Sequence, residues 1–361
     1  MKNAFLSHAD AAQRNRNNIL RYVRAHQPIS RTDIWEAMDI SRASVTQIIR
    51  QLQESGLIVE TGEGESTGGR KPRYLMFRGT AKKFFAFDWL TRTLCLMDLG
   101  GRLIREINLD LAGKVSPESF AQAIVQHIEQ MEKQGLCGRE EVAGLALSLP
   151  GLVDIRTGTV IYSVELDWHD VNVFELFKAH FGENVYIERL TNIMALGEHA
   201  DGSAENTSHF QLFVLGHGGI GVATIVHGNC QHGANYMYGE LGHIKLPVDV
   251  LCSCGQRGCL EAIVKEELRR SGGVVTDQIL EYLSIGVATS VNISDARTIV
   301  LTGSLVETMN QEQRDTLSAL ICEKVTGQQL RKLRIHYRED TKALAIKGIG
   351  EFFFDSYFPT E

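Results

Sequence analysis

Three cysteines and one histidine lie close together in the second half of the chain and supply a complete set of metal ligands. Cys252, Cys254 and Cys259 fall within eight residues, and His243 precedes them in the run Tyr-Gly-Glu-Leu-Gly-His. Three thiolates and one imidazole are the donors of a closed, tetrahedral zinc site. Glycines between the cysteines allow the tight backbone that brings Cys259 back to the other two. The pattern therefore predicts one zinc ion held by these four residues.

Two other interpretations of these cysteines are weaker. Buried thiols also pack as small hydrophobic side chains, but three of the seven cysteines lie within eight residues here. Disulfide bonds form in oxidising compartments, and residues 1–14 lack the apolar core of a signal peptide. No apolar run reaches the ~20 residues that a membrane helix needs. With 361 residues, 43% of them hydrophobic, the sequence predicts a soluble cytoplasmic protein of two or three domains.

The charge of the chain is unevenly distributed. Residues 1–80 carry 12 Lys and Arg against 8 Asp and Glu, a net charge of +4, within a chain whose net charge is −7. The remaining residues therefore carry −11. A basic head on an acidic body indicates that the head, and not the body, meets a polyanion.

The basic head shows the pattern of a helix-turn-helix. The first helix is expected over residues 13–25, and Ser30 with Asp33 predicts a capping box at the start of a second. Ser41 is the expected cap of a third helix, which runs through residue 54 and is closed by Gly56. Apolar residues at helical spacing give this third helix one buried face: Val45, Ile48, Ile49 and Leu52.

The opposite face of the third helix is polar and suits the edges of bases in a major groove. Its residues are Arg42, Ala43, Ser44, Thr46, Gln47 and Arg50. A glycine-rich hairpin follows, and its basic residues Arg70, Lys71 and Arg73 predict a wing that contacts phosphates or a minor groove. Each feature alone is compatible with a solvated surface, but their order along the chain predicts a winged helix that binds double-stranded DNA.

From residue 83 onward, the pattern indicates two α/β units. In the first, strands are expected at 83–89, 94–99, 103–109 and 142–149, with a helix at 117–134. In the second, strands are expected at 210–215, 222–227 and 298–301. The repetition suggests two lobes with a cleft between them.

The motifs around the cysteines resemble the ROK family, which contains bacterial repressors and sugar kinases. The matching residues are Gly239, Glu240, Gly242 and His243, and then Cys252, Cys254, Gly255, Gly258, Cys259, Leu260 and Glu261. The resemblance implies a two-lobed, actin-like (ribonuclease-H-type) body in which the histidine and cysteines hold zinc. It also implies that Glu240, His243 and Glu261 contact sugar hydroxyls, and that Pro150 and Gly151 belong to the same pocket.

The head matches the winged helix of ROK repressors, which the kinases of the family lack. We therefore expect an α/β protein with three domains: a DNA-binding head at 1–80, a first ROK lobe at 81–208 and a second lobe with the zinc module at 209–361. The segment between Glu261 and the helix around residue 285 is shorter than the resemblance implies, which leaves the oligomeric arrangement open.

The resemblance also shows where kinase chemistry is missing. The first phosphate loop of the kinases matches Asp88-Trp89-Leu90-Thr91, where two bulky side chains replace glycines and are expected to obstruct ATP. A second loop, at residues 218–223, is degraded. Leu190 stands where the kinases have the aspartate that acts as general base, and leucine cannot accept a proton. We therefore expect no enzyme activity.

Arg189 replaces the asparagine that the family has beside the general base, and two interpretations are open. In one, Arg189 points to solvent or pairs with Glu188, and the pocket has lost its sugar. In the other, its guanidinium binds an anionic ligand such as a sugar phosphate or a sugar acid.

These patterns predict a transcriptional regulator of carbohydrate metabolism, most simply a repressor that binds operator DNA as a homodimer or a dimer of dimers. Its effector is expected to be a sugar or sugar phosphate. One alternative is a ROK sugar kinase with an added DNA-binding head. Another is a ROK regulator controlled by a protein partner, such as a component of the sugar phosphotransferase system. The sequence does not distinguish the first expectation from the last.

Overall fold

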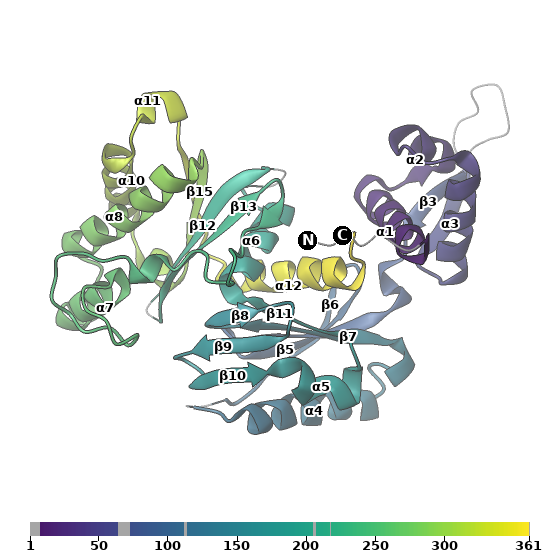
Figure 1. The fold of residues 1–361 in the computed structure, drawn as a ribbon, viewed down its shortest axis with the longest axis horizontal. Coiled ribbons are helices and arrows are strands. Elements are labelled where there is room, and N and C mark those ends of the chain that lie inside the picture. The colour runs from purple at the N-terminus through teal and green to yellow at the C-terminus, as the bar shows by residue number, and fades with distance from the viewer. Residues whose placement is uncertain (1–7, 64–72, 112–113, 205–206, 217, 361) are drawn as a thin grey trace.

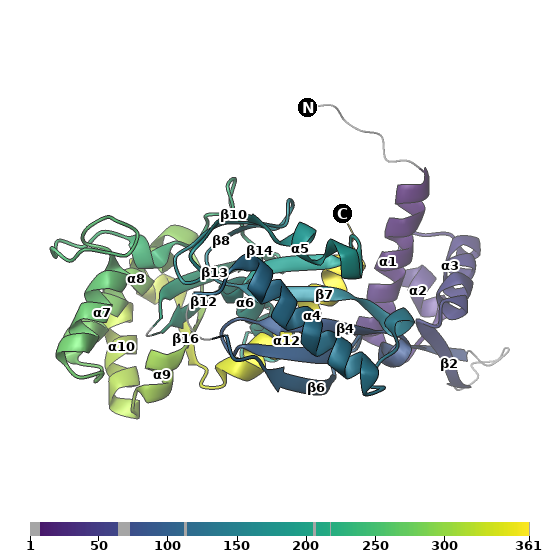
Figure 2. The ribbon, with the colours of Figure 1, turned by 90° about the horizontal axis from the view of Figure 1, so that it is seen from below.

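The computed structural model describes residues 8–63, 73–111, 114–204, 207–216 and 218–360. These residues form a small head and two larger α/β lobes (Figure 1). In the view of Figure 2 the first lobe lies between the head and the second lobe. Within the described residues, we find no helix that combines the length and the apolar character needed to cross a membrane.

The head is a winged helix whose local signals match the sequence. Its elements are α1 (His8–His26), β1 (Ile29–Ser30), α2 (Arg31–Ala37), α3 (Arg42–Glu54), β2 (Ile58–Glu63) and β3 (Arg73–Phe77), with sheet order β1-β3-β2. Ser30 and Asp33 form the predicted capping box at the start of α2. Ser41 caps α3 by accepting from the backbone N–H of Ser44. The one clear difference is α1, which begins five residues earlier than expected.

The hydrophobic core of the head continues into the body. The four predicted apolar residues of α3 are buried, and they share one cluster with Ile19, Leu20 and Val23 of α1. The same cluster includes Phe84 of the first lobe and Phe353 near the C-terminus, whose rings stack with centroids 4.0 Å apart. The head therefore packs on the body, and the two are not separated by a free linker.

The first lobe is built on a mixed sheet of five strands. Their order is β11 (Val185–Arg189), β7 (Val142–Leu149), β4 (Lys83–Asp88), β5 (Thr93–Asp98) and β6 (Leu103–Asn108). Side chains alternate across β4, as in any strand. Phe85 and Phe87 share a cluster with α4 (Pro117–Lys133) and α5 (Val173–Phe181), whereas Phe84 faces α12 (Thr341–Tyr357). A smaller sheet adjoins it, formed by β10 (Trp168–Asn172), β9 (Thr159–Ser163) and β8 (Leu152–Asp154).

The second lobe repeats this sheet topology. Its order is β14 (Asn229–Cys230), β13 (Ile220–Val226), β12 (His209–Leu215), β15 (Thr298–Thr302) and β16 (Arg334–Tyr337). In each lobe the central strand pairs antiparallel with the next strand in sequence and parallel with a later one. The helices of the second lobe are α7 (Leu260–Arg270), α8 (Asp277–Ser294), α9 (Ser304–Thr308), α10 (Gln311–Lys324) and α11 (Gln328–Arg331). The two lobes therefore confirm the expected pair of related α/β units, and the strand at 142–149 has its predicted bounds.

The segment after Glu261, which appeared short in sequence, is mostly helical. The helix α7 continues to Arg270, and a short turn leads directly into α8. The helix expected around residues 285–292 is the second half of α8.

Two helices lie side by side between the sheets of the two lobes. The helix α6 (Leu190–Asp201) packs along α12 (Figure 1), and both contribute to the cluster that covers β12. The other side of α12 packs on β4 and β7. The helix α12, which follows β16, therefore packs between the two lobes.

The two central helices approach closely because each has a glycine at the contact. A Cβ atom on Gly197 would overlap the carbonyl oxygen of Leu344, and one on Gly348 would overlap that of Ile193. Any larger residue at these positions would separate the helices.

The end of α12 also holds the head. Arg24 pairs with Glu351 at 2.8 Å and stacks on the ring of Phe354, while Arg21 pairs with Asp355 at 2.6 Å. Burial raises the pKa of Asp355, although the charge of Arg21 opposes this shift. These contacts join the first helix of the chain to the last.

The glycine contact between α6 and α12 predicts a specific loss of stability. We expect Gly348→Ala to lower the free energy of unfolding by about 1–3 kcal/mol, because the added methyl group overpacks the contact. Gly350→Ala in the same helix is the control, since its nearest neighbours would lie at 3.5 Å, and alanine is favoured over glycine inside helices by ~1 kcal/mol. Urea unfolding followed by circular dichroism measures both. Equal effects of the two substitutions would contradict this account.

Candidate functional site

The four predicted metal ligands come together at one end of the second lobe. His243 ends the short 3-10 helix η3 (Leu241–His243), and the cysteines lie on the loop before α7 and at its start. Backbone bridges between Lys245 and Cys259, and between Leu251 and Arg257, fold this loop back on itself. Glycine is required at two of its turns, since residues 255 and 258 have φ values of 84° and 77°.

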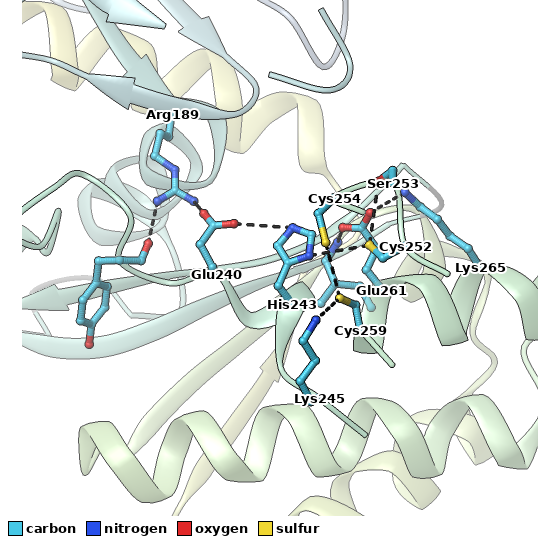
Figure 3. A network of polar contacts seen from close by, with 12 residues as sticks. Arg189, Glu240, His243, Lys245, Cys252, Ser253, Cys254, Cys259, Glu261 and Lys265 are labelled. Atoms are coloured by element: carbon cyan, nitrogen blue, oxygen red, sulfur yellow. Dashed lines mark hydrogen bonds and ion pairs between the residues drawn. The ribbon is translucent and has the colours of Figure 1, made fainter. Parts of the chain in front are cut away.

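The geometry of the cluster suits a tetrahedral metal ion. One ligand atom from each of the four residues lies within 4.8 Å of the others. Cys254 Sγ and Cys259 Sγ are 3.7 Å apart, and Cys252 Sγ is 3.8 Å from His243 Nδ1 (Figure 3). Bonds of ~2.3 Å to zinc place tetrahedral sulfur ligands ~3.8 Å apart. The predicted residues are thus brought together at the separation that a metal ion requires.

A lysine next to the cluster was not predicted. Lys245 Nζ lies 2.8 Å from Cys259 Sγ. Burial raises the pKa of the Cys259 thiol, and the hydrogen bond from Lys245 opposes this shift. No spacing rule identifies this residue, because its proximity depends on how the loop folds.

His243 connects the cluster to Glu240. The ring presents Nδ1 to Cys252, while Nε2 faces Glu240 Oε2 at 3.8 Å. A carboxylate on the far side of a metal-binding histidine orients the ring. Glu240 is therefore placed to orient the histidine of the cluster.

Arg189 does not pair with Glu188, the partner that one of the two interpretations gave it. Its guanidinium donates to Glu240 Oε1 at 2.7 Å and to the carbonyl of Tyr238 at 2.6 Å (Figure 3). The side chain is only 11% exposed, so it does not point to solvent. Glu188 accepts from the backbone N–H of Arg189 and does not pair with the guanidinium.

The buried carboxylate of Glu188 forms a second set of contacts beside Arg189. Its carboxylate accepts from Asn192 Nδ2 at 2.9 Å and lies 2.6 Å from His232 Nε2. Burial lowers the pKa of His232, but the hydrogen bond to Glu188 outweighs this and raises the pKa above its ordinary value. Sequence reasoning missed His232, because it lies 44 residues from its partner.

Glu261 is held by its own helix and by the glycine-rich segment. Lys265, one helical turn further along α7, donates to Glu261 Oε1 at 2.6 Å. The backbone N–H of Ile220 donates to Oε2 at 3.2 Å. This N–H belongs to the second degraded phosphate loop, so it is already engaged within the protein. A cavity of about 270 Å³ lies beside Glu261, between the cysteine loop and α7.

The first phosphate loop is closed by hydrogen bonds, but not in the way that we expected. Asp88 accepts from the backbone N–H and hydroxyl of Thr91 and from the hydroxyl of Ser148. Trp89 is 1% exposed and packs in the core of the first lobe, so the expectation that its ring blocks the approach of ATP is wrong. Trp89 directly follows the last residue of β4, and its indole N–H donates to Glu165 Oε1 at 2.7 Å. Leu90 is the exposed residue, at 44%.

Leu190, Pro150 and Gly151 are the remaining residues that the sequence singled out in the body. Leu190 begins α6 and packs against the apolar cluster between the lobes. Pro150 and Gly151 join β7 to β8, and Gly151 lies close against Tyr162 and Ser163 of β9. Their role in ligand binding stays a prediction.

The predicted DNA-reading residues lie on the outer surface of the head. Arg42, Ala43, Thr46, Gln47 and Arg50 are exposed along α3, and Ser44 is half-buried. The guanidinium of Arg42 stacks on Trp35 at 4.0 Å, and Arg50 pairs with Glu54 at 2.9 Å.

The wing is described only at its base. Arg70 and Lys71 lie outside the described residues. Arg73 pairs with Glu60 at 2.9 Å, and Arg31 pairs with the same carboxylate at 2.7 Å. These two hydrogen-bonded arginines lower the pKa of Glu60 to about 2, so the base of the wing carries a fixed ion-pair network.

Comparison with known proteins matches the body of the chain to one family and the head to another. Residues 93–271 match the ROK family and residues 14–61 match the MarR family. The chain is 30% identical over 263 residues to the "Putative xylose repressor" of Caldicellulosiruptor sp. (strain Rt8B.4), which covers 72% of this chain and 66% of that protein. It is 28% identical over 292 residues to the DNA-binding transcriptional dual regulator NagC of Escherichia coli (strain K12), which covers 78% and 68%.

Solved structures agree on the fold. A ROK family transcriptional regulator, a homologue of the E. coli MLC protein, superposes with a TM-score of 0.81 at 20% identity, over 96% of this chain and 98% of the other. A ROK hexokinase from Thermus thermophilus superposes with a TM-score of 0.57 at 21% identity, over 74% and 97%. The chain therefore belongs to the ROK family and combines a MarR-like winged-helix head with a two-lobed ROK body.

Proposed function

We propose that the protein is a sequence-specific DNA-binding regulator of transcription, which represses genes of carbohydrate metabolism. The observation that carries this proposal is the exposed polar face of α3, presented by a head whose core is continuous with the ROK body. Relatives with both families of domain are named as regulators, among them NagC and the xylose repressors. In functional terms, residues 1–80 read DNA and residues 81–208 and 209–361 form the sensor.

The arrangement of the head supports reading of base edges by α3. Gln47 and Thr46 are exposed, and the stacking of Arg42 on Trp35 places its charge near the N-terminus of the helix. A single winged helix makes few contacts with DNA, whereas two heads spaced by one turn multiply them. We therefore propose a homodimer or a dimer of dimers as the form that binds operator DNA.

The cleft of the body is the proposed sensor. Glu240, His243 and Glu261 are gathered around the metal cluster (Figure 3), and a sugar or sugar phosphate is the proposed effector. A protein partner that contacts the body, such as a phosphotransferase component, is the second candidate. An effector alters DNA binding only if it binds two arrangements of the heads with different affinity.

We propose zinc as the metal, because three thiolates and one imidazole are its preferred closed set. Zinc would stabilise the loop and fix the ring of His243 relative to Glu240. With all four positions filled by protein ligands, it has a structural role.

We further propose that the body does not transfer phosphate from ATP. Leu190 packs into an apolar cluster and has no basic atom, and the carboxylate of Asp88 is already engaged by Thr91 and Ser148. The missing general base alone corresponds to a loss of ~10²- to 10⁴-fold.

The metal proposal predicts one zinc ion per chain in purified protein. Cys252→Ser combined with Cys254→Ser should remove the metal and lower the melting temperature, because ligation is coupled to folding of the loop. Cys322→Ser is the control, since this half-buried cysteine lies outside the cluster. Plasma mass spectrometry measures the metal. An unchanged zinc content in the double variant would refute the assignment.

The DNA proposal predicts that selection from a random DNA library yields a defined operator. Gln47→Ala should then alter the preferred sequence and weaken binding by about 1–3 kcal/mol, as expected for loss of a base contact. Gln51→Ala, exposed near the end of α3, should leave the preference unchanged. Mobility shifts at fixed salt measure both. Failure of the wild-type protein to enrich any sequence would overturn the proposal.

The absence of phosphate transfer predicts that ADP formation with hexoses, pentoses and N-acetylhexosamines equals the rate without protein. Leu190→Asp should not restore turnover, because Asp88 would remain engaged by Thr91 and Ser148. A coupled ADP assay with a ROK glucokinase as the positive control measures this. Sugar-dependent turnover by the wild-type protein would show that the body is an enzyme.

A further inference from the structure

A group of polar contacts joins the end of β11 in the first lobe to one loop of the second lobe. On the first lobe are Glu188 and Arg189, at the end of β11. On the second lobe is the loop of residues 231–240, which runs from β14 to η3. The loop provides His232, the carbonyl of Tyr238 and the carboxylate of Glu240. The three contacts have lengths of 2.6, 2.6 and 2.7 Å.

Burial distinguishes these contacts from the ion pairs on the surface. The side chains of Arg189 and Glu240 are 11% and 33% exposed, and those of His232 and Glu188 are 23% and 3% exposed. Those of Arg257 and Asp249, which pair at 2.6 Å within the second lobe, are 60% and 81% exposed. An exposed pair contributes little to stability. Loss of one partner from a buried pair leaves an uncompensated charge and is strongly unfavourable.

The loop that Arg189 contacts is itself fixed. The carbonyl of Gly239 accepts from the backbone N–H of Val222 on β13, and the second oxygen of Glu240 faces His243 of the metal cluster. Arg189 thus connects the sheet of the first lobe to the metal-binding end of the second (Figure 3).

We infer that Arg189 is a gate for the ligand: it clamps the two lobes together in the absence of ligand and occupies the carboxylate of Glu240. This inference rests on the proposed sensor role of the cleft. A neutral polyhydroxyl ligand reaches Glu240 only after the guanidinium has been displaced. An anion is not attracted in its place, because the charge of Arg189 is already balanced, and separation of the pair would leave Glu240 without a partner. Arg189 is accordingly a specificity-determining residue that lowers affinity for neutral sugars, and not a receptor for phosphate.

Hydrogen–deuterium exchange of the full chain, read by mass spectrometry, tests whether Arg189 holds the loop of residues 231–240 in place. Arg189→Ala should raise exchange in peptides that cover residues 231–240 by about tenfold, because the loop opens locally once its partner is lost. Glu240→Gln should raise exchange in the same peptides, because it removes the other partner of the ion pair. This second variant keeps the test valid if one of the two folds poorly. Arg257→Ala is the matched control and should leave them unchanged. Unchanged exchange in both clamp variants would overturn the inference.

Ligand titration tests the gate. Calorimetry with glucose, xylose and N-acetylglucosamine should show about tenfold tighter binding of at least one sugar to Arg189→Ala than to wild type, because no guanidinium competes for Glu240. No gain for any of the three would overturn the gate. So would tighter binding of glucose 6-phosphate to wild type than to Arg189→Ala, since this would show a guanidinium free to receive an anion.

The DNA-binding assay separates a failure of the gate hypothesis from a failure of the proposed regulator function. If the wild-type protein fails to bind DNA, the regulator proposal falls, while exchange and titration still decide the role of Arg189. If DNA binding is confirmed and the clamp variants behave as wild type, only the gate is lost.

Discussion

The burial of α12 on both of its sides is the contact on which the arrangement of the whole molecule depends. One side packs on the sheet of the first lobe, the other side contributes to the cluster that covers β12, and its end holds the head through Arg21 and Arg24. This helix thus contacts the head and both lobes, and it shares the apolar contact between the lobes with α6. Its glycine contact with α6 places the backbones of the two helices against each other, and closely packed interiors transmit displacement with little loss.

The four candidate metal ligands lie where the hydrophobic core provides little local order. Their loop contains two isolated backbone bridges, one nested within the other, and the cysteines share only a small apolar cluster with Val250 and Ala262. Four ligands converging on one ion fix such a segment more effectively than packing does. The carboxylate of Glu240 then lies between two anchored groups, the histidine of the cluster and the guanidinium of the first lobe.

The features that sequence predicted well are those that depend on neighbours within a few residues. The capping box of Ser30 and Asp33, the buried face of α3 and the clustering of the three cysteines all follow from short spacings. The strand at 142–149 was also recognisable, because buried parallel strands are continuous apolar runs.

The errors concern contacts between distant parts of the chain. Arg189 finds Glu240 some fifty residues away, and His232 finds Glu188 across the cleft, so neither pairing leaves a signal in the local pattern. Trp89 turned out to be buried because the direction of a side chain at a strand end is set by the layer packed against it. The packing of α12 between the two lobes could not be predicted for the same reason. An amphipathic pattern shows that a helix packs on something, but it does not show which element that is.

The position of α12 along the chain also affects the order in which the protein is made. This helix follows every other described element and leaves the ribosome after them, and domains fold during synthesis from the N-terminal side. The helices and the capping box of the head are synthesised first. The residues that pair with Arg21 and Arg24 are synthesised last. A growing chain therefore carries a folded head with no fixed orientation. The orientation of the head on the body is set only when synthesis has passed residue 355.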